Sequence, residues 1–243
     1  MVEHSERIDA VLRRYKDEVM RWNAGFSLVS RVATLDRLDN LVAESVSSYE
    51  ALMESVLPAA ESSFPGPAAA YHYADLGSGA GIPGLVWHLL SGELGFGGRE
   101  HVGSILVEPR HKRAWFLERA IEVMGLRDIR VGEDQWGPRT ALCGDDLPAS
   151  MTGVVTMKAL RLTDEEVIAG WRRYRRDVRA ADDSLVICRL HGRSRGLDDD
   201  LRGRLRLPAA GSGGCPGTPR ACLFPVGGDS RPWSLLVSLY PHL

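Results

Sequence analysis

The chain contains the run Ala74-Asp75-Leu76-Gly77-Ser78-Gly79-Ala80-Gly81-Ile82-Pro83-Gly84, in which glycines crowd together directly after an acidic residue. A short aromatic run, residues 71–74, precedes it, and an apolar run with helical spacing, residues 85–90, follows it. These flanks predict a strand before the glycines and a helix after them. Glycine suits such a turn because the backbone takes unusual dihedrals and approaches a ligand closely. The run therefore predicts a ligand-binding loop that ends at a helix N-terminus.

The residues of this loop narrow the choice of ligand. A glycine-rich turn can hold NAD, FAD or a phosphate, but no Gly-Lys-Ser/Thr ending is present, which disfavours a nucleoside triphosphate. A carboxylate at Asp75 would repel a pyrophosphate and attract an ammonium group. S-adenosylmethionine carries an ammonium and a sulfonium, so it fits better than a dinucleotide. A glycine-rich turn without any ligand is the structural alternative.

Composition places the chain among ordinary globular proteins. Its 243 residues are 44% apolar and 26% charged, and the formal net charge is −2. No apolar run approaches the roughly 18 residues of a membrane span, and the polar, acidic start is unlike a signal peptide. The four cysteines form no Cys-x-x-Cys pair, so we expect no metal. We expect a cytoplasmic monomer that does not bind a membrane.

Apolar periodicity divides the chain into two parts. Residues 1–61 predict a helical N-terminal cap, 62–70 a linker, and 71–243 a Rossmann-like domain in which strands and helices alternate. Within this domain residues 91–103 predict a Gly-rich insertion and residues 192–219 a flexible loop. The expected strands are 71–74, 105–107, 128–131, 153–157 and 184–188, the expected helices are 112–124 and 164–178, and a terminal hairpin is expected over 221–226 and 234–240. The predicted fold is a doubly wound α/β sheet with an antiparallel edge.

Several motifs together resemble one enzyme family, the RsmG (also called GidB) methyltransferases, which act on guanine N7 of 16S ribosomal RNA. The likeness covers roughly residues 10–190, and the Ile-Pro-Gly ending of the glycine loop is its most specific part. The motifs are Trp22-Asn23, Ser27-Leu28-Val29-Ser30, Glu44-Ser45, the run 75–84, and Leu106-Val107-Glu108-Pro109-Arg110-His111-Lys112-Arg113. The resemblance implies a class I methyltransferase fold beneath a helical cap, with S-adenosyl-L-methionine as cofactor.

The resemblance also implies which residues bind the cofactor. The glycine loop would hold the methionine part through Asp75, Gly77, Ser78, Gly79, Gly81 and Ile82. Glu108, at the end of the second strand, would accept hydrogen bonds from the ribose hydroxyls, although a solvated strand-end carboxylate is the alternative. The loop after the third strand would flank the adenine through Gln135 and Trp136. Trp136 is as readily explained by burial beneath this loop.

After the fourth strand the family has Ser-Arg-Ala, with the arginine facing cofactor and substrate, whereas this chain has Met157-Lys158-Ala159. Lys158 is thus a candidate cofactor and substrate contact that keeps the charge but lacks the planar fork of arginine. Guanine N7 carries a lone pair and no proton, so positioning accounts for the chemistry and no catalytic base is expected.

The expected partner is ribosomal RNA or the 30S subunit. Arg110, Lys112, Arg113 and Arg161 are the predicted RNA contacts, and Arg172, Arg173, Arg175 and Arg176 are further candidates for phosphates. For these last four a solvated helix face is the competing interpretation. Several family positions are altered, so two alternatives stay open: a small-molecule methyltransferase, and a non-catalytic RNA-binding relic of the fold.

Overall fold

A computed structural model gives the fold and describes residues 2–29, 35–56, 70–95, 99–144, 146–158, 160–175, 183–191, 220–226, 233–240 and 243. The helices are α1 (Val2–Phe26), α2 (Leu35–Ala51), α4 (Gly84–Leu94), α5 (His111–Met124) and α6 (Asp164–Tyr174), and a short π-helical turn, η1 (Leu52–Val56), follows α2. The strands are β1 (Ala70–Leu76), β2 (Glu100–Val107), β3 (Ile129–Gly132), β4 (Thr152–Lys158), β5 (Ser184–His191), β6 (Arg220–Val226) and β7 (Trp233–Tyr240). Within these ranges no helix has the length and apolarity that crossing a bilayer requires.

The described strands form one seven-stranded sheet in the order β3-β2-β1-β4-β5-β7-β6. Strands β1 to β5 pair in parallel, whereas β7 runs antiparallel to both β5 and β6. The predicted doubly wound sheet with an antiparallel terminal hairpin is confirmed. The hairpin closes the sheet with β7 inside and β6 at the edge.

The order of the strands reverses at β1. Strands β2 and β3 lie on one side of it, and β4 and β5 lie on the other. The register pairs Leu76 of β1 with Val107 of β2 and with Met157 of β4, so these three strands end at the same level. In open parallel sheets a ligand binds outside the carboxyl ends of the strands at such a reversal. The glycine loop, Glu108 and Lys158 all follow or end these strands, and the sheet brings them to one edge.

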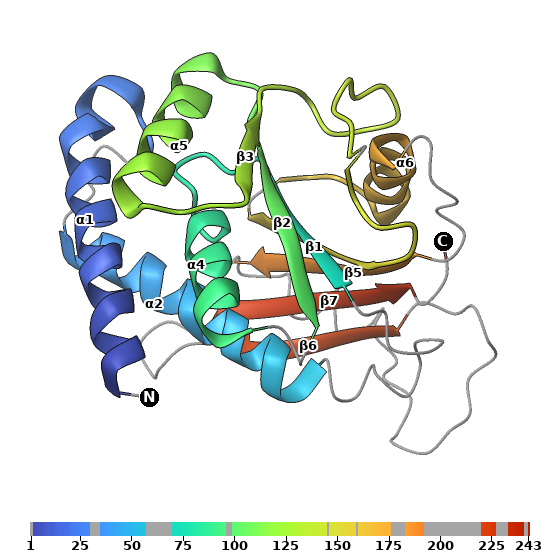
Figure 1. The fold of residues 1–243 in the computed structure, drawn as a ribbon, viewed down its shortest axis with the longest axis horizontal. Helices are drawn as coiled ribbons and strands as arrows, with labels where there is room; N and C mark the ends of the chain where they lie inside the picture. Colours follow the sequence, from blue (N-terminus) through green and yellow to red (C-terminus); the bar gives the residue numbers. More distant parts are fainter. Residues whose placement is uncertain are drawn as a thin grey trace.

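Two layers of helices cover the sheet, with α1, α2, α4 and α5 on one face and α6 on the other (Figure 1). The first core joins Tyr15 and Leu38 of the N-terminal helices to Tyr73 of the sheet, and the second packs Trp171 of α6 against the opposite face. The expected cap therefore shares a core with the sheet. Of the expected linker, 62–70, only residue 70 is described, as the first residue of β1, and the domain boundary stays a prediction.

Two helices near the site begin and end as local chemistry requires. Helix α5 ends at Gly125, whose φ of 69° is left-handed, as the sequence predicted. Helix α6 begins with a capping box, in which Glu166 N donates to Thr163 Oγ1 and Thr163 N donates to a Glu166 carboxylate oxygen. The end of α6 is at Tyr174, four residues before the predicted 178, and residues 176–182 lie outside the described part of the chain.

Two predicted boundaries are wrong because long-range packing overrides local signals. Residues 23–25, Asn-Ala-Gly, predict the end of the first helix, but α1 runs to Phe26, whose ring packs on Trp22 and Trp115. The expected Gly-rich insertion over 91–103 is shorter, since α4 continues to Leu94 and β2 already begins at Glu100 through parallel pairing with β1. The sequence of residues 100–104 contains no local pattern that predicts their pairing with β1. The predicted loop 192–219 lies outside the described residues.

Candidate active site at the carboxyl edge of the sheet

The glycine loop turns back over the ends of β1 and β2. Gly77, Gly79 and Gly81 have φ angles of 70°, 57° and 87°, all in the left-handed region that side chains disfavour. Val107 O accepts hydrogen bonds from Gly77 N at 2.8 Å and from Ser78 N at 3.1 Å. The loop is thus fastened to the neighbouring strand, as a preformed ligand cradle requires.

Glu108 ties the loop to the start of α5. Its Oε2 accepts from Gly79 N at 3.0 Å and its Oε1 accepts from Arg110 N at 3.0 Å. The side chain is only 3% exposed, so the alternative of a solvated strand-end carboxylate does not describe it. Each carboxylate oxygen still has a lone pair to offer, because an ionised carboxylate accepts up to about four hydrogen bonds. Glu108 can therefore orient the loop and accept from a ligand hydroxyl at the same time.

Asp75 lies beneath the loop, 1% exposed. Its Oδ1 accepts from Thr156 Oγ1 at 2.6 Å, while its Oδ2 has no hydrogen-bond partner among the described residues. Gly84 allows this close approach, since a Cβ there would come within 2.5 Å of Asp75 Oδ2. Burial raises the pKa of Asp75 to about 6, and hydrogen bonds such as that of Thr156 partly oppose the shift. A buried carboxylate with one unused oxygen is suited to a cationic ligand.

The other loop residues differ in their exposure. Ser78 and Ile82 are buried, and Ser78 Oγ donates to Asp75 O at 2.9 Å, so both shape the loop from inside. The backbone at Gly77 and Gly79 is half-buried, and Gly81 is buried against Leu85. The surface that the loop presents to a ligand is thus mainly its backbone.

The N-terminal helices close over this loop. Tyr15 of α1 is fully buried and donates from its hydroxyl to Ala80 O at 2.6 Å. Arg113 of α5 donates to Ser27 O, just after α1, at 2.7 Å, and its guanidinium is the group nearest to a Cβ built on Gly79, at 3.8 Å. Arg113, predicted to bind RNA, therefore lies at the junction of cap and loop.

Lys158 pairs with a residue of the cap that the sequence had left without a role. Its Nζ lies 3.6 Å from Glu44 Oε2 of α2, and the side chains are 16% and 14% exposed. Burial lowers the pKa of Lys158, whereas the charges of Glu44 and Asp75 raise it. A partly buried ion pair beside a ligand loop contributes little to stability and is typical of functional sites. Lys158 is therefore not a freely exposed lysine at a strand end.

Residues that sequence reasoning missed act through these contacts. The sequence alone assigns no role to Glu44, Tyr15 or Thr156, because each lies far along the chain from its partner. The motif Glu44-Ser45 was the one signal that could have found Glu44. Tyr15 looked like any apolar position of a helical stripe, and Thr156 like any strand residue.

The loop after β3 separates its two candidate residues. Gln135 is exposed. Trp136 is 8% exposed, donates from its indole nitrogen to Val167 O at 3.1 Å and packs on Gly170 of α6. The interpretation as a buried tryptophan therefore describes Trp136, and no adenine contact is assigned to it.

The predicted RNA contacts also differ in their exposure. Arg110, Lys112 and Arg161 are exposed. Arg172 and Arg173 are also exposed, on α6. Arg175 is a correction: it is 1% exposed and its guanidinium binds the buried carboxylate of Asp183, with Nε at 2.9 Å from Oδ2. Removing either buried charge would leave the other uncompensated, so Arg175 is structural and cannot contact phosphate. Arg176 lies outside the described residues.

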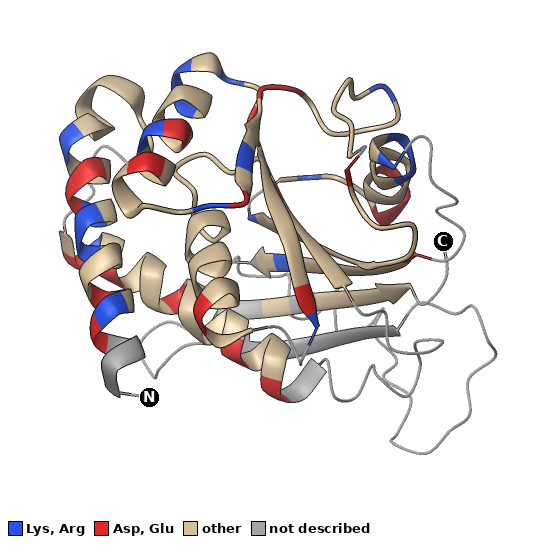
Figure 2. Cartoon of the chain, viewed as in Figure 1, with Lys and Arg blue, Asp and Glu red and all other residues tan. Residues whose placement is uncertain are grey.

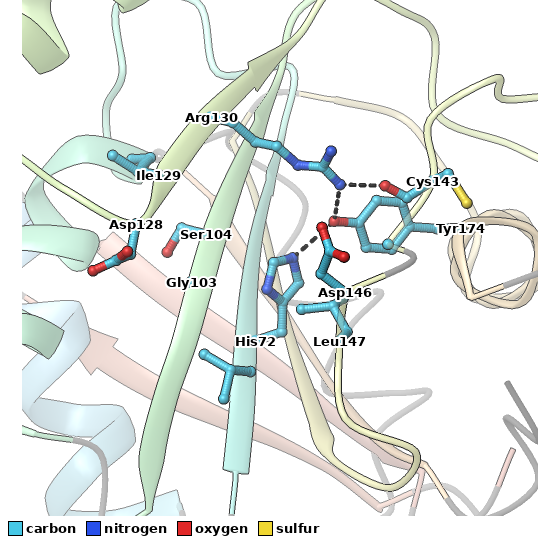
Figure 3. Close-up of a pocket in the computed structure, with 12 residues that line it drawn as sticks. His72, Gly103, Ser104, Asp128, Ile129, Arg130, Cys143, Asp146, Leu147 and Tyr174 are labelled. Atoms are coloured by element: carbon cyan, nitrogen blue, oxygen red, sulfur yellow. Dashed lines mark hydrogen bonds between the residues drawn. The ribbon is translucent and has the colours of Figure 1, made fainter.

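A separate cavity of about 380 Å³ opens at the opposite edge of the sheet, near the amino ends of β1 and β2 (Figure 3). Tyr174 links its polar groups, since its hydroxyl lies 2.8 Å from Arg130 Nη2 and 3.1 Å from His72 Nε2. Burial lowers the pKa of His72 to about 3, which keeps the imidazole neutral. None of the sequence-predicted site residues lines this cavity. The glycine loop, Glu108 and Lys158 lie instead at the carboxyl edge, which is therefore the candidate site.

Comparison with known proteins identifies the family. A family model described as "GidB: rRNA small subunit methyltransferase G" matches residues 8–140, which is more than half of the chain. The chain belongs to the GidB family. The match confirms the resemblance and covers the N-terminal helices, the glycine loop, Glu108 and the start of α5. It ends before the expected residue 190 and does not reach Lys158.

Individual relatives are more distant. "Ribosomal RNA small subunit methyltransferase G" of Acidiphilium cryptum (strain JF-5) is 32% identical over 132 residues, which cover 51% of this chain and 52% of that protein. The chain thus spans about half the length of this curated GidB relative. An rRNA methylase from Streptococcus thermophilus matches with a TM-score of 0.41 and 12% identity, over 79% of this chain and 93% of that one. A SAM-dependent methyltransferase from Aquifex aeolicus matches with a TM-score of 0.41 and 14% identity, over 80% of this chain and 97% of that one. Because both TM-scores are below 0.5, the assignment of the fold is based on the observed strand order and not on these matches.

Proposed function

We propose that this GidB-family protein is an S-adenosylmethionine-dependent methyltransferase that methylates guanine N7 in 16S ribosomal RNA. The observation that carries the proposal is the glycine loop, placed where the strand order reverses and braced by Glu108 through Gly79 N at 3.0 Å. Family membership supports ribosomal RNA as the substrate class.

The residues present fit the cofactor. Asp75 offers a buried carboxylate oxygen without a partner among the described residues, which suits the ammonium and sulfonium charges. Glu108 has spare lone pairs for the ribose hydroxyls, and the half-buried backbone of Gly77 and Gly79 suits the methionine part. When bound, S-adenosylmethionine supplies an electrophilic methyl group on a cationic sulfur. Gln135 stays a proposed contact near the adenine.

Lys158 and Glu44 are the proposed contacts for the acceptor base. Guanine presents O6, an acceptor, beside N1–H, a donor, and this is the complement of an ammonium beside a carboxylate. Adenine presents the reverse pattern at the same positions, so the pair Lys158 and Glu44 favours guanine. With O6 held by Lys158, the neighbouring N7 is directed by the same contact. N7 uses its own lone pair, so these residues need only position the base and transfer no proton.

The start of α5 supports an RNA substrate on electrostatic grounds. Arg110, His111, Lys112 and Arg113 surround its N-terminus, and no acidic residue lies in its first turn. Figure 2 marks the positions of the Lys and Arg residues along the ribbon. Positive side chains at the positive end of a helix dipole are unfavourable, unless an anion binds there. Phosphates of the substrate are the proposed anion, with Arg161 as a further contact.

Cofactor binding should depend on pH through Asp75. Burial raises the pKa of Asp75 in the free protein to about 6, so protonation below that pH removes the charge that attracts the ammonium. A bound cation lowers the pKa of Asp75. The affinity for the cofactor is therefore highest above the pKa of the free protein and falls as the pH decreases below it. We expect the affinity to weaken by up to about tenfold per pH unit between about pH 6 and pH 5.

Calorimetric titration with S-adenosylmethionine across this range measures the effect. The matched variant Asp75→Asn cannot ionise and should bind weakly with a flat profile. An equally flat profile for the wild-type protein would mean that Asp75 does not act on the ligand charge.

The function itself is tested by methyl transfer. Tritiated cofactor is offered to 30S subunits and to 16S RNA from a strain that lacks the gene, and the label is mapped. Label on guanine N7 is the expected result. Label on another atom, or only on a small molecule, contradicts the substrate, whereas cofactor binding without label on any acceptor indicates a non-catalytic relic.

A further inference from the structure

An aromatic groove lies between α1 and α5, outside the candidate site. It encloses about 590 Å³ and is lined by Arg21, Trp22, Trp115, Glu118, Arg119 and Glu122. Trp115 is 40% exposed, although tryptophan is a largely buried residue type. A large exposed aromatic side chain in a polar-rimmed groove is a feature of binding surfaces.

Trp115 is held in a fixed orientation before any ligand arrives. Its ring lies 5.0 Å from that of Trp22 at 73° and 5.6 Å from that of Phe26 at 72°. Arg21 lies over the Trp22 ring at 5.8 Å. The indole therefore loses little conformational entropy on binding, as a stacking platform requires.

The charges of the groove indicate what can enter it. Arg119 is neutralised by Glu18 at 3.2 Å and by Glu122 at 2.7 Å, while Glu118 and Glu122 are exposed. These carboxylates repel phosphate but accept hydrogen bonds from exocyclic amino groups of bases. Lys112 lies one helical turn before Trp115, on the same face of α5, at the predicted phosphate contact. A nucleobase in the groove with its phosphate at Lys112 satisfies both conditions.

We propose that this groove binds an unstacked RNA base that carries an exocyclic amino group, by stacking on Trp115. The inference rests on the proposed function, because RNA is the substrate class there. It adds a second RNA contact outside the candidate site, joined to it by α5, whose Arg113 lies beside Gly79 of the loop. Single-stranded RNA is recognised in this way, since every base offers a face to stack on an aromatic ring.

The test measures binding of labelled oligocytidine and oligouridine by fluorescence anisotropy. Trp115→Leu keeps apolar packing against Trp22 but cannot stack, so it should weaken oligocytidine binding about tenfold, whereas Trp115→Phe should stay within about twofold. Leu94→Ala removes an apolar side chain of α4 that is more exposed than Trp115, at 58%, and is the matched control, expected to change nothing. Glu118→Gln leaves packing intact and should reduce the preference of the wild-type protein for oligocytidine over oligouridine.

Several outcomes overturn the inference. If Trp115→Leu binds oligocytidine as tightly as the wild-type protein does, the base does not stack on Trp115. If the wild-type protein binds both oligonucleotides with equal affinity, the carboxylates do not recognise the amino group. If Trp115→Leu lowers methylation of 30S particles without changing binding of free RNA, the groove contacts a protein. Parallel cofactor titration separates the two proposals: cofactor binding without any RNA binding refutes the RNA substrate as well, whereas RNA methylation with an unchanged Trp115→Leu refutes the groove alone.

Discussion

Replacing Gly79 with valine will abolish cofactor binding while the protein remains folded. The φ of Gly79 is 57°, and a β-branched residue there is strongly strained. A Cβ at this position meets nothing closer than 3.8 Å, so the fold can tolerate it. Relief of the strain must displace Gly79 N from Glu108 Oε2. Returning the loop to its binding conformation restores the strain, which costs about 3 kcal/mol and weakens binding about hundredfold.

Calorimetry with S-adenosylmethionine and thermal unfolding measure the two effects separately. Gly92→Val is the matched control, because Gly92 lies in α4 with nothing within 4 Å of a Cβ and no left-handed φ. Gly84→Ala should differ by lowering stability: its Cβ would come within 2.5 Å of Asp75 Oδ2 and 2.7 Å of Leu106, so unfolding should occur at lower temperature. Undiminished cofactor affinity in Gly79→Val would mean that the ligand site is elsewhere.

Replacing Lys158 with methionine will remove methyl transfer but not cofactor binding. Methionine keeps the apolar length of the side chain and loses the ammonium that is proposed to hold guanine O6. Because a lost donor at a reacting base costs about a hundredfold in rate or more, kcat/KM for RNA should fall by that amount. At a pH well above that at which Asp75 protonates, the cofactor Kd should change by less than about threefold, since Glu108 and the glycine loop remain.

Lys16→Met is the control for this substitution. Lys16 is likewise paired with a carboxylate, Asp39, but on the outer side of the N-terminal helices. It should leave both measurements unchanged. Glu44→Gln should lower the preference for guanine, because an amide both donates and accepts. Retained activity of Lys158→Met on 30S subunits would show that the base is positioned by other residues.

Much of the fold follows from local sequence, and the exceptions share a cause. Gly125 ends α5 and the glycine loop joins β1 to α4, as local dihedral preferences dictate. The limits of β2 and α1 were misplaced because Glu100 and Phe26 are held by partners distant in sequence. Local patterns contain no information about such partners.

The candidate site shows the same division. The run 75–84 and Glu108 could be predicted because adjacent residues form one turn and one strand end. Lys158 was predicted as a contact, but its partner Glu44 was not, since α2 and β4 meet only through the packed core. Arg175 looked like its exposed neighbours Arg172 and Arg173, and only packing of α6 shows it buried on Asp183.

The sequence by itself determined the glycine-rich turn between strand and helix, the alternation of strands and helices, and the family to which the chain belongs. Dihedral demands, periodicity and motif spacing act over a few residues and can be read from the chain alone. Tertiary structure decided the pairing of Glu44 with Lys158, the burial of Trp136 and Arg175, and the exposure of Trp115 beside Trp22. These features depend on which surfaces meet when the helices cover the sheet. Packing against residues distant in sequence decides which charged side chains are paired and which side chains a ligand can reach.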